Sequence, residues 1–447
     1  MGWRYTLPEL AGIIEAGRPS VNTPFTAVST DTRTLEPGDV FIALTGNRFD
    51  GNEFVAEAFR KGACAAVTTK PNASGPCLIV PDTLRALQAF AARHRNRYRI
   101  PVIAITGSCG KTSTKDMAAA VLATKYTVVK TRGNLNNEIG CPLSLLQIDD
   151  ETDLAIIEMG ANHPGEIARL CELARPTEGA IIMVAPAHLE GFGTIENVAK
   201  AKAELVDALP RDGIFYANAD DEWCVRIADS FPGTTVRFGR SGDIMLNSLS
   251  YDSAGQMCVD IDRVGKLKLP LYCPAHVTNV LLAVAIGLHH RVTAFEQPLR
   301  EACAALDRFR LTHVGPLEVI DDTYNANPSS MAAALDALAA RPGSGARIAA
   351  LGEMLELGDA AADLHREVGA RAGGAGVRCL FARGPHACDT IAGAIAAKVP
   401  HAEEIEDHDA MARAIREIAR PGDVLLVKGS RATQMERVIE ELRRLYS

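Results

Sequence analysis

A glycine-rich segment followed by a lysine and a threonine offers the clearest chemistry in this sequence. The apolar run VIAIT (102–106) leads into the segment GSCGKTS (107–113). Glycines let the backbone turn so that its N–H groups hold phosphate oxygens, and a helix opening behind them adds its positive end. The lysine adds a full charge and the threonine can ligate magnesium, which a turn needing only glycines would not require. We predict a nucleotide phosphate site made of Thr106, Gly107, Ser108, Cys109, Gly110, Lys111, Thr112 and Ser113.

The composition is that of an ordinary globular enzyme. The 447-residue chain carries a net charge of −8, which argues against nucleic-acid binding through bulk electrostatics. Its 11 cysteines show no CxxC pair and no zinc spacing, and most lie in apolar runs, as small buried thiols do. The N-terminus has no basic-then-apolar signal, and no segment reaches the length of a membrane span. We therefore expect a cytoplasmic protein with several domains and no membrane insertion.

Apolar runs of strand length and amphipathic helical patterns divide the chain into three expected domains. Residues 1–82 combine short strands with one clear helix, at residues 52–63. Over residues 83–312, strand and helix patterns alternate, which predicts parallel strands covered by helices. Residues 313–447 repeat this alternation in a Rossmann-type unit. The predicted fold class is α/β, with a small N-terminal domain, a central P-loop parallel-sheet domain and a C-terminal Rossmann-like domain.

Amide and carboxylate groups follow strand patterns of the central domain. The segment TRGNLNNEIGCP (131–142) offers more amide groups than an ordinary loop needs, among them Asn136 and Asn137. Glu158 ends a strand that should run parallel to the glycine-rich strand. Because ligands gather at the carboxyl ends of parallel strands, Glu158 is placed to meet magnesium on the nucleotide. The alternative for Glu158 is a solvated acid at a strand end.

A histidine and two lysines come later in the central domain. His188 follows a buried strand, and the helical pattern after it contains Lys200 and Lys202. On residue types alone, a satisfied structural histidine and a solvated lysine face are the simpler interpretation.

Two segments of the C-terminal domain place polar groups at expected strand ends. DDTYNANPSSM puts Asp322, Tyr324 and Asn325 before a helix that starts at a proline. VKGSRAT puts Lys428 and Arg431 beside another helix start. Charged and amide groups that face a nucleotide domain suit ligand contact, whereas helix capping alone would need only one Asn or Ser in each segment.

Seven segments, taken together and in order, resemble the Mur ligases of peptidoglycan synthesis. They are TGSCGKTS, GNLNNEIGCPLSLL, EMGAN, AHLEGFGTIENVAKAKAEL, DDTYNANPSSM, GEMLELGD and LLVKGSR. The N-terminal strings STDTR and PGDVFIAL are also similar to the uridine-binding domain of one branch of that family. YNANPSSM followed by GEMLELGD is typical of the branch that adds D-alanyl-D-alanine, and the DNPR-type motif of the diamino-acid-adding branch is absent from the sequence.

This resemblance implies an ATP-dependent, ADP-forming ligation that makes an amide bond. ATP would phosphorylate the terminal carboxylate of UDP-N-acetylmuramoyl-tripeptide, and the amine of D-alanyl-D-alanine would attack the acyl phosphate. The expected partners are these two substrates, without nucleic acid, and the protein is expected to be a monomer. Two alternatives stay open: another Mur-type ligase, such as a diamino-acid-adding enzyme or folylpolyglutamate synthase, and a P-loop nucleotide regulator without ligase chemistry.

The resemblance also implies roles for residues around the phosphate segment. Catalytic roles are implied for Lys111, Glu158, His188 and Lys202. One Mg²⁺ would be held by Thr112 and Glu158, and a second by His188 and a carbamylated lysine, matched to Lys202 with Lys200 as the alternative. A carbamate is an anionic oxygen ligand of the kind that magnesium prefers, whereas a bare ammonium repels it. Further ATP contacts are implied for Asn279, Arg310, Asp322, Tyr324 and Asn325.

Substrate binding is implied for the N-terminal domain and the Asn-rich segment. Polar turns at residues 29–39 and 45–52 flank one strand, and residue types alone allow either plain loops or a ligand site there. The resemblance places Thr30, Thr32, Arg33, Asn47 and Arg48 at uridine diphosphate, and Asn136 and Asn137 along the muramoyl-peptide. Three domains that share substrates imply closure, so we expect the C-terminal domain to lie away from the phosphate segment until ligand binds.

Overall fold

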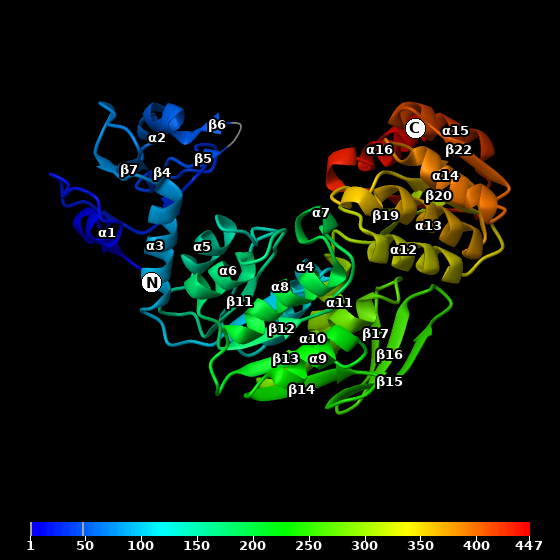
Figure 1. The fold of residues 1–447 in the computed structure, drawn as a ribbon, viewed down its shortest axis with the longest axis horizontal. Helices are drawn as coiled ribbons and strands as arrows, with labels where there is room; N and C mark the ends of the chain where they lie inside the picture. Colours follow the sequence, from blue (N-terminus) through cyan, green and yellow to red (C-terminus); the bar gives the residue numbers. More distant parts are fainter. Residues whose placement is uncertain (1, 47–48) are drawn as a thin grey trace.

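The computed structural model describes residues 2–46 and 49–447, and three α/β domains follow one another along an arc (Figure 1). The N-terminal domain has a parallel sheet of β3 (Val28–Ser29), β4 (Val40–Ile42), β7 (Ala65–Thr68) and β8 (Cys77–Ile79), in that order. Two antiparallel pairs join β1 (Tyr5–Thr6) to β2 (Pro24–Phe25) and β5 (Thr45–Gly46) to β6 (Phe49–Asp50). The helices are α1 (Leu7–Ile13), the 3-10 turn η1 (Gly51–Phe54) and α2 (Val55–Arg60). The predicted helix at residues 52–63 therefore forms in two parts, and α1 lies outside the predicted elements.

One long helix, α3 (Thr83–Arg95), joins the N-terminal and central domains. The side chain of Asp82 caps its N-terminus by accepting hydrogen bonds from two backbone N–H groups. The helix packs on α1 and on two central-domain helices, so one hydrophobic core runs from the first domain into the second. Trp3 lies in this core, where its Nε1 donates to the Leu146 carbonyl at 2.6 Å and its ring meets Phe90 of α3 edge-on. The N-terminal domain is thus anchored by buried aromatic packing.

The central domain is built on a nine-stranded sheet in which the strand before the glycine-rich segment, β9, is third from one edge. The order is β10-β11-β9-β12-β13-β14-β15-β16-β17, with parallel neighbours from β10 to β15. The strands are β9 (Val102–Thr106), β10 (Val128–Lys130), β11 (Leu154–Glu158), β12 (Glu178–Ile181), β13 (Ile214–Asn218), β14 (Thr234–Gly239), β15 (Ile244–Tyr251), β16 (Met257–Ile261) and β17 (Gly265–Leu269). The pairs β15–β16 and β16–β17 are antiparallel, which departs from the predicted strand–helix alternation. These strands mix buried and exposed residues, so a search for apolar runs misses them.

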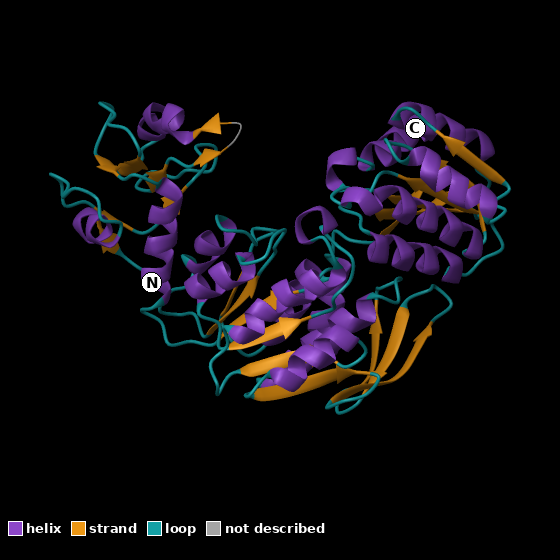
Figure 2. Cartoon of the chain, viewed as in Figure 1, coloured by secondary structure: helices purple, strands orange, loops and turns teal. Residues whose placement is uncertain are grey.

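Helices cover both faces of the central sheet (Figures 1 and 2). One face carries α4 (Lys111–Leu122), α10 (His276–His289) and α11 (Glu296–Ala304). The other carries α5 (Gly140–Leu145), α6 (Glu166–Ala174), α8 (Ile195–Asp207) and α9 (Glu222–Ser230). A one-turn helix, α7 (Leu189–Phe192), precedes α8. The helices α4, α6, α8 and α10 supply the helical part of the strand–helix alternation predicted for residues 83–312.

The C-terminal domain repeats the layered arrangement on a six-stranded sheet. Its order is β18 (Arg310–Val314), β19 (Leu317–Asp322), β23 (Val424–Lys428), β20 (Arg347–Leu351), β21 (Val377–Ala382) and β22 (His401–Glu404), parallel except for β18. The helices α12 (Pro328–Ala340), α13 (Ala361–Gly374) and α14 (Ala387–Ala396) pack on one face, and α15 (His408–Ile418) and α16 (Glu436–Tyr446) on the other. Short 3-10 turns are η2 (Gly358–Ala360) and η3 (Arg431–Thr433). The sheet already includes Arg310, ahead of the expected boundary at residue 313, and the predicted α/β class with three domains is confirmed.

All 11 cysteines are free, and six of them are buried, as expected for small thiols in apolar runs. Within the residues that the structure describes, no helix combines the length and the apolar character needed to cross a bilayer.

Trp3→Ala should lower the free energy of unfolding by about 3–5 kcal/mol, because it empties a buried aromatic site between two domains. Calorimetric unfolding measures this loss, and limited proteolysis reports any release of the N-terminal domain. Trp3→Phe is the matched control, since it keeps one aromatic ring; it loses the hydrogen bond to Leu146 and part of the ring volume, and should cost clearly less than Trp3→Ala. Equal losses in the two variants would contradict the packing role of the indole.

Candidate active site

The glycine-rich segment forms a tight loop between β9 and α4. Gly107 has a φ of +152° and Gly110 a φ of +83°, conformations that residues with a Cβ rarely adopt. A Cβ at Gly110 would lie 2.4 Å from Oδ1 of Asn279, on α10. Backbone conformation and close approach therefore both require glycine at this position. The same contact places Asn279, a predicted nucleotide residue, directly beside the loop.

Side chains of the loop tie it to the neighbouring strands. Thr106 Oγ1 donates to a carbonyl just after β11, and Ser108 Oγ donates to a carbonyl after β12, each at 2.8 Å. Lys111 Nζ donates to the Gly107 carbonyl at 2.8 Å, so its ammonium lies over the loop. The first N–H groups of α4 have no partner within the helix and are available to an anion. The loop is thus held from both sides, with the Ser108 N–H donating to the Met183 carbonyl at 3.0 Å, and the N–H groups at the start of α4 face the predicted phosphate site.

Glu158, at the end of β11, presents a buried carboxylate to this loop. Thr112 Oγ1 donates to its Oε1 at 3.2 Å, and Asn136 Nδ2 donates to the same oxygen at 2.8 Å. Its side chain is 1% exposed, so the alternative of a solvated acid is wrong. Oε2 is buried and accepts no hydrogen bond within the described residues. A carboxylate oxygen without a donor, beside a hydroxyl, fits a Mg²⁺ ion.

A cation at Glu158 would need ligands from outside the protein. Among the described residues, no three His, Cys, Asp or Glu side chains gather into a potential metal site. Magnesium commonly takes one or two protein oxygens and completes its shell with water and substrate phosphates. Thr112 and Glu158 match that kind of site, and they lie beside the loop that is predicted to hold nucleotide phosphates.

The Asn-rich segment supports Glu158 and the start of α5. Asn136 holds the Glu158 carboxylate, and the Asn136 carbonyl accepts a hydrogen bond from the Gly160 N–H at 2.9 Å. Asn137 Oδ1 accepts hydrogen bonds from the N–H groups of Ile139 and Gly140 at 3.2 and 2.9 Å, which caps α5. Both predicted peptide-binding amides are therefore engaged within the fold, and their contact with substrate stays a prediction.

His188 lies at the seam between the central and C-terminal domains. It has a φ of +52° just before α7, and its Nδ1 pairs with Oε2 of Glu356 from the C-terminal domain. The backbone joins this contact, because the Glu190 N–H donates to the Glu356 carbonyl at 3.1 Å. Glu356 belongs to the GEMLELGD segment but is missing from the predicted site residues. Only the fold reveals it, because the two segments are far apart in the chain.

Burial distinguishes the two candidate lysines on α8. Lys202 is buried, whereas Lys200 is exposed. Burial, together with the charge of Lys111, lowers the pKa of Lys202 to about 7. Burial also lowers the pKa of His188, on which the charges of Lys111 and Lys202 act as well. The predicted catalytic groups Lys111, His188 and Lys202 therefore lie within electrostatic reach of one another.

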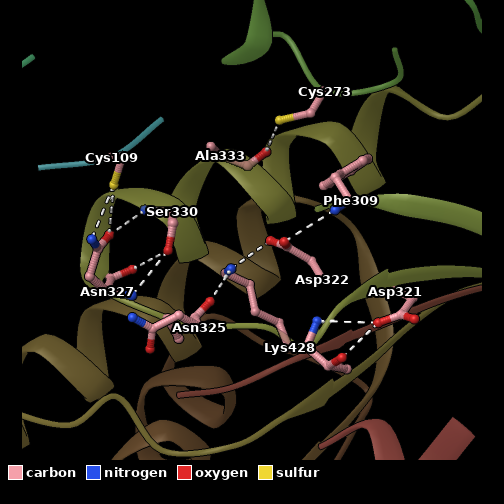
Figure 3. Close-up of polar contacts among 12 residues, drawn as sticks. Cys109, Cys273, Phe309, Asp321, Asp322, Asn325, Asn327, Ser330, Ala333 and Lys428 are labelled. Atoms are coloured by element: carbon pink, nitrogen blue, oxygen red, sulfur yellow. Dashed lines mark hydrogen bonds and ion pairs between the residues drawn. The ribbon is translucent and has the colours of Figure 1, made fainter. Parts of the chain in front are cut away.

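The C-terminal domain touches the phosphate loop directly (Figure 3). Asn327 Nδ2 lies 3.1 Å from Sγ of Cys109, while Asn327 Oδ1 accepts a hydrogen bond from the Ser330 N–H at 2.8 Å and caps α12. The two domains are therefore in contact at the loop in this structure, and opening of the C-terminal domain in the absence of ligand stays a prediction. Polar groups of the two domains satisfy one another across the seam, here and at Glu356.

Predicted nucleotide residues of the C-terminal domain meet around a buried lysine (Figure 3). Lys428 Nζ lies 2.5 Å from Asp322 Oδ2 and donates to the Asn325 carbonyl at 2.8 Å. The other Asp322 oxygen accepts a hydrogen bond from the Phe309 N–H at 3.3 Å. Asp322 thus joins the linker between the domains to the end of β23, and Lys428 balances its charge.

Two arginines flank Phe309, which has a φ of +51°. Arg310, the predicted phosphate contact, is exposed and pairs with Asp321 at 2.8 Å. The Arg308 guanidinium lies over the ring of Tyr324, and the charge of Glu158 acts on it. Arg308 is therefore a further candidate for phosphate contact that sequence reasoning missed, since no motif residue marks it.

The predicted uridine residues lie in the N-terminal domain, at the opposite end of the arc from the C-terminal domain (Figure 1). Thr32 is buried and Thr30 half-buried. Arg33 is exposed and pairs with Asp31, and this guanidinium lowers the pKa of the Asp31 carboxyl to about 2. Asn47 and Arg48 lie outside the described residues. Contact of these residues with uridine diphosphate stays a prediction.

Gly110→Ala should weaken ATP binding at least about tenfold, because strained backbone and a collision with Asn279 would both distort the loop. Titration calorimetry with a non-hydrolysable ATP analogue measures the affinity. Gly38→Ala is the matched control: Gly38 has a φ of +96°, but its Cβ would meet no atom within 4 Å, and it lies in the N-terminal domain. Wild-type affinity in Gly110→Ala would argue against the loop as the phosphate site.

Family models match all three domains. Residues 24–98 match the model described as Mur ligase family, catalytic domain. Residues 105–287 match the Mur ligase middle domain, and residues 307–431 the Mur ligase, glutamate ligase domain. The three matched spans fall, in order, on the N-terminal, central and C-terminal domains.

Named relatives and solved structures agree with the domain models. The UDP-N-acetylmuramoyl-tripeptide–D-alanyl-D-alanine ligases of Escherichia coli and Bacillus subtilis are 36% and 34% identical, over 98% and 93% of this chain and 98% and 92% of theirs. MurF from Acinetobacter baumannii superposes with a TM-score of 0.90 at 29% identity over 99% of both chains. MurF from Thermotoga maritima, solved with ADP, superposes at 0.83 with 29% identity over 94% of this chain and 97% of its own. The chain therefore belongs to the Mur ligase family.

Proposed function

We propose that this protein joins D-alanyl-D-alanine to UDP-N-acetylmuramoyl-tripeptide in an ATP-dependent, ADP-forming reaction. The supporting observation is that the YNANPSSM segment of the C-terminal domain meets the phosphate loop, through Asn327 and Cys109. A regulator that only binds nucleotide has no need of this meeting, whereas a ligase must bring a second substrate to the γ-phosphate. Among the alternatives, the diamino-acid-adding and folylpolyglutamate ligases share the family fold but lack the YNANPSSM–GEMLELGD combination.

The chemistry follows from the poor reactivity of a carboxylate. A carboxylate oxygen of the tripeptide attacks the γ-phosphorus, the bond to the β-phosphate oxygen breaks, and ADP leaves. The dipeptide amine then attacks the acyl carbon, the carbon–oxygen bond to phosphate breaks, and the amine gives up a proton as the amide forms. Lys111 offsets the repulsion between the two anions as they approach.

Thr112 and Glu158 are the residues that would hold a first Mg²⁺ ion. Bound there, magnesium supplies positive charge that offsets the negative charge of the phosphates. The buried Oε2 of Glu158, which lacks a hydrogen-bond donor among the described residues, supports this assignment. Asn136 fixes the other carboxylate oxygen and so orients Glu158 toward the loop.

His188 and Lys202 are the residues that would hold a second Mg²⁺ ion. Carbamylation joins the neutral Lys202 amine to the carbon of CO₂ and releases one proton, which leaves an anionic oxygen ligand. Burial beside Lys111 supports this role, because both factors favour the neutral amine over the ammonium. Glu356 brings a carboxylate from the C-terminal domain to His188, so we assign it a place in this site as well.

The remaining substrate contacts are proposed for the N-terminal half of the chain. Uridine diphosphate would lie against the turns that carry Thr30, Thr32, Arg33, Asn47 and Arg48. The muramoyl-peptide would then extend toward Asn136 and Asn137 and reach the loop in the central domain. The enzyme is proposed to act as a monomer, since one chain supplies every residue named.

One assay tests the proposed reaction. Purified protein with ATP, Mg²⁺ and UDP-N-acetylmuramoyl-tripeptide should release phosphate only when D-alanyl-D-alanine is added. Diaminopimelate and glutamate, offered with the acceptors of their own ligases, serve as the competing amines. Phosphate release that depends on either of them would identify another Mur-type ligase, and release without any amine would indicate a nucleotide regulator.

Lys111→Ala should reduce phosphate release about 100-fold or more while the fold stays intact, because the main cation over the loop is lost. Steady-state phosphate release and circular dichroism measure the two effects. Lys125→Ala is the control, since Lys125 lies beyond the end of α4 and contacts backbone carbonyls near the end of α10. Activity retained by Lys111→Ala would remove the loop from the mechanism.

Lys202→Ala should lose at least about tenfold in activity and regain part of it with a short-chain carboxylate such as acetate, which can replace the carbamate oxygens. Lys200→Ala, on the same helix but exposed, should retain activity. Loss in Lys200→Ala instead, or no response of Lys202→Ala to any carboxylate, would contradict the carbamate assignment.

A further inference from the structure

A second lysine of α4 is buried beside the metal carboxylate without a part in the proposed chemistry. Lys115 lies one helical turn beyond Lys111, and its side chain is 1% exposed. Its Nζ donates to the Gly133 carbonyl at 2.8 Å and lies 3.7 Å from Oε2 of Glu158. Burying an ammonium is costly unless a negative group compensates it. Lys115 therefore calls for a partner, and Glu158 is close enough to be one.

The other charged groups near Lys115 and Glu158 do not replace the pairing between these two side chains. Asp116 Oδ1 lies 3.6 Å from Lys115 Nζ, but the same oxygen lies 2.6 Å from Lys130 Nζ at the surface. Thr112 and Asn136 bond only to Oε1 of Glu158. Among the described residues, Lys115 is the one cationic side chain within ion-pair distance of Glu158. The Glu158 oxygen that has no hydrogen bond therefore faces the Lys115 ammonium.

We infer that Lys115 is a resident cation that balances Glu158 before metal arrives and makes divalent-metal binding depend on nucleotide. This inference rests on the proposed function, which places Mg²⁺ at Thr112 and Glu158. In the nucleotide-free protein, the ammonium already offsets the carboxylate and repels a second cation. The triphosphate adds several negative charges at the loop, and their attraction outweighs that repulsion. Metal then enters together with ATP and does not occupy the site alone.

The contact with Gly133 extends this role to the Asn-rich segment. Lys115 holds the backbone of that segment at Gly133, close to Asn136, which itself holds Glu158. One ammonium thus fixes the carboxylate and the loop that orients it. Lys115 is a positioning residue, because it acts through Glu158 and does not touch a reacting atom.

Manganese binding in the absence of nucleotide tests the inference. Electron paramagnetic resonance measures free Mn²⁺ in the presence of the wild-type protein, Lys115→Met and Lys130→Met. Lys115→Met should bind Mn²⁺ at least about tenfold more tightly than the wild type, since the repulsive charge is gone. Lys130→Met, which removes a surface cation that pairs with Asp116, should bind it as the wild type does. Wild-type or weaker Mn²⁺ binding in Lys115→Met would overturn the inference.

A double-mutant cycle keeps the inference testable if Lys115→Met unfolds easily. Lys115→Met should lower the thermal midpoint of the metal-free protein by several degrees, because Glu158 is left without its cation. Adding Glu158→Gln should recover more than half of that loss, whereas additive losses would overturn the inference. Lys115→Gln, which can still donate to Gly133, provides a second neutral variant for the Mn²⁺ measurement.

The same Mn²⁺ measurement in the presence of nucleotide distinguishes failure of this inference from failure of the proposed metal site. With a non-hydrolysable ATP analogue, Glu158→Gln should weaken Mn²⁺ binding. Unchanged binding in that variant would refute the metal site itself. If Glu158→Gln weakens binding with nucleotide while Lys115→Met behaves as the wild type without it, the metal site stands and only the role of Lys115 fails.

Discussion

The cost of burying an ammonium group is the physical constraint that organises this site, and three lysines of the described residues are buried. Lys115, Lys202 and Lys428 are each no more than 2% exposed. Lys115 and Lys428 lie beside the carboxylates of Glu158 and Asp322, which offset the cost of removing an ammonium from water. Lys202 has no ion pair within the described residues, and its pKa falls to about 7. The environment therefore separates two lysines that lie beside carboxylates from one buried lysine that has no such partner among the described residues.

The junction between the N-terminal and central domains and the junction between the central and C-terminal domains are held together by different contacts. The N-terminal and central domains share one hydrophobic core around α3 and Trp3, which makes a rigid unit. The C-terminal domain meets the central domain through polar contacts at Asn327 and Glu356, and Cys273 and Tyr272 of the central domain also pack against its hydrophobic core. A junction with few apolar contacts separates at lower cost than a shared core, so we expect domain motion there.

Much of the fold and of the candidate site could be predicted from the sequence, because most of the predicted site residues lie in short segments that carry their own motif. The loop, the strand ending in Glu158 and the helix opening after Asn327 each carry their own residues and turn signals. The antiparallel strands β15 to β17 could not be recognised as apolar runs, because they mix buried and exposed residues. Glu356, Arg308 and Lys115 were out of reach for another reason. Their importance depends on contacts between segments that only the folded chain brings together, such as the contact of Glu356 with His188.

The central claim is that the phosphate loop turns a carboxylate into an acyl phosphate. Labelling the terminal carboxylate of the tripeptide with ¹⁸O and analysing the released phosphate by mass spectrometry tests this claim most directly. The account predicts one ¹⁸O atom in each phosphate released with D-alanyl-D-alanine, because the acyl carbon–oxygen bond breaks in the second step. Phosphate without label, released at the same rate as the amide product, would contradict it.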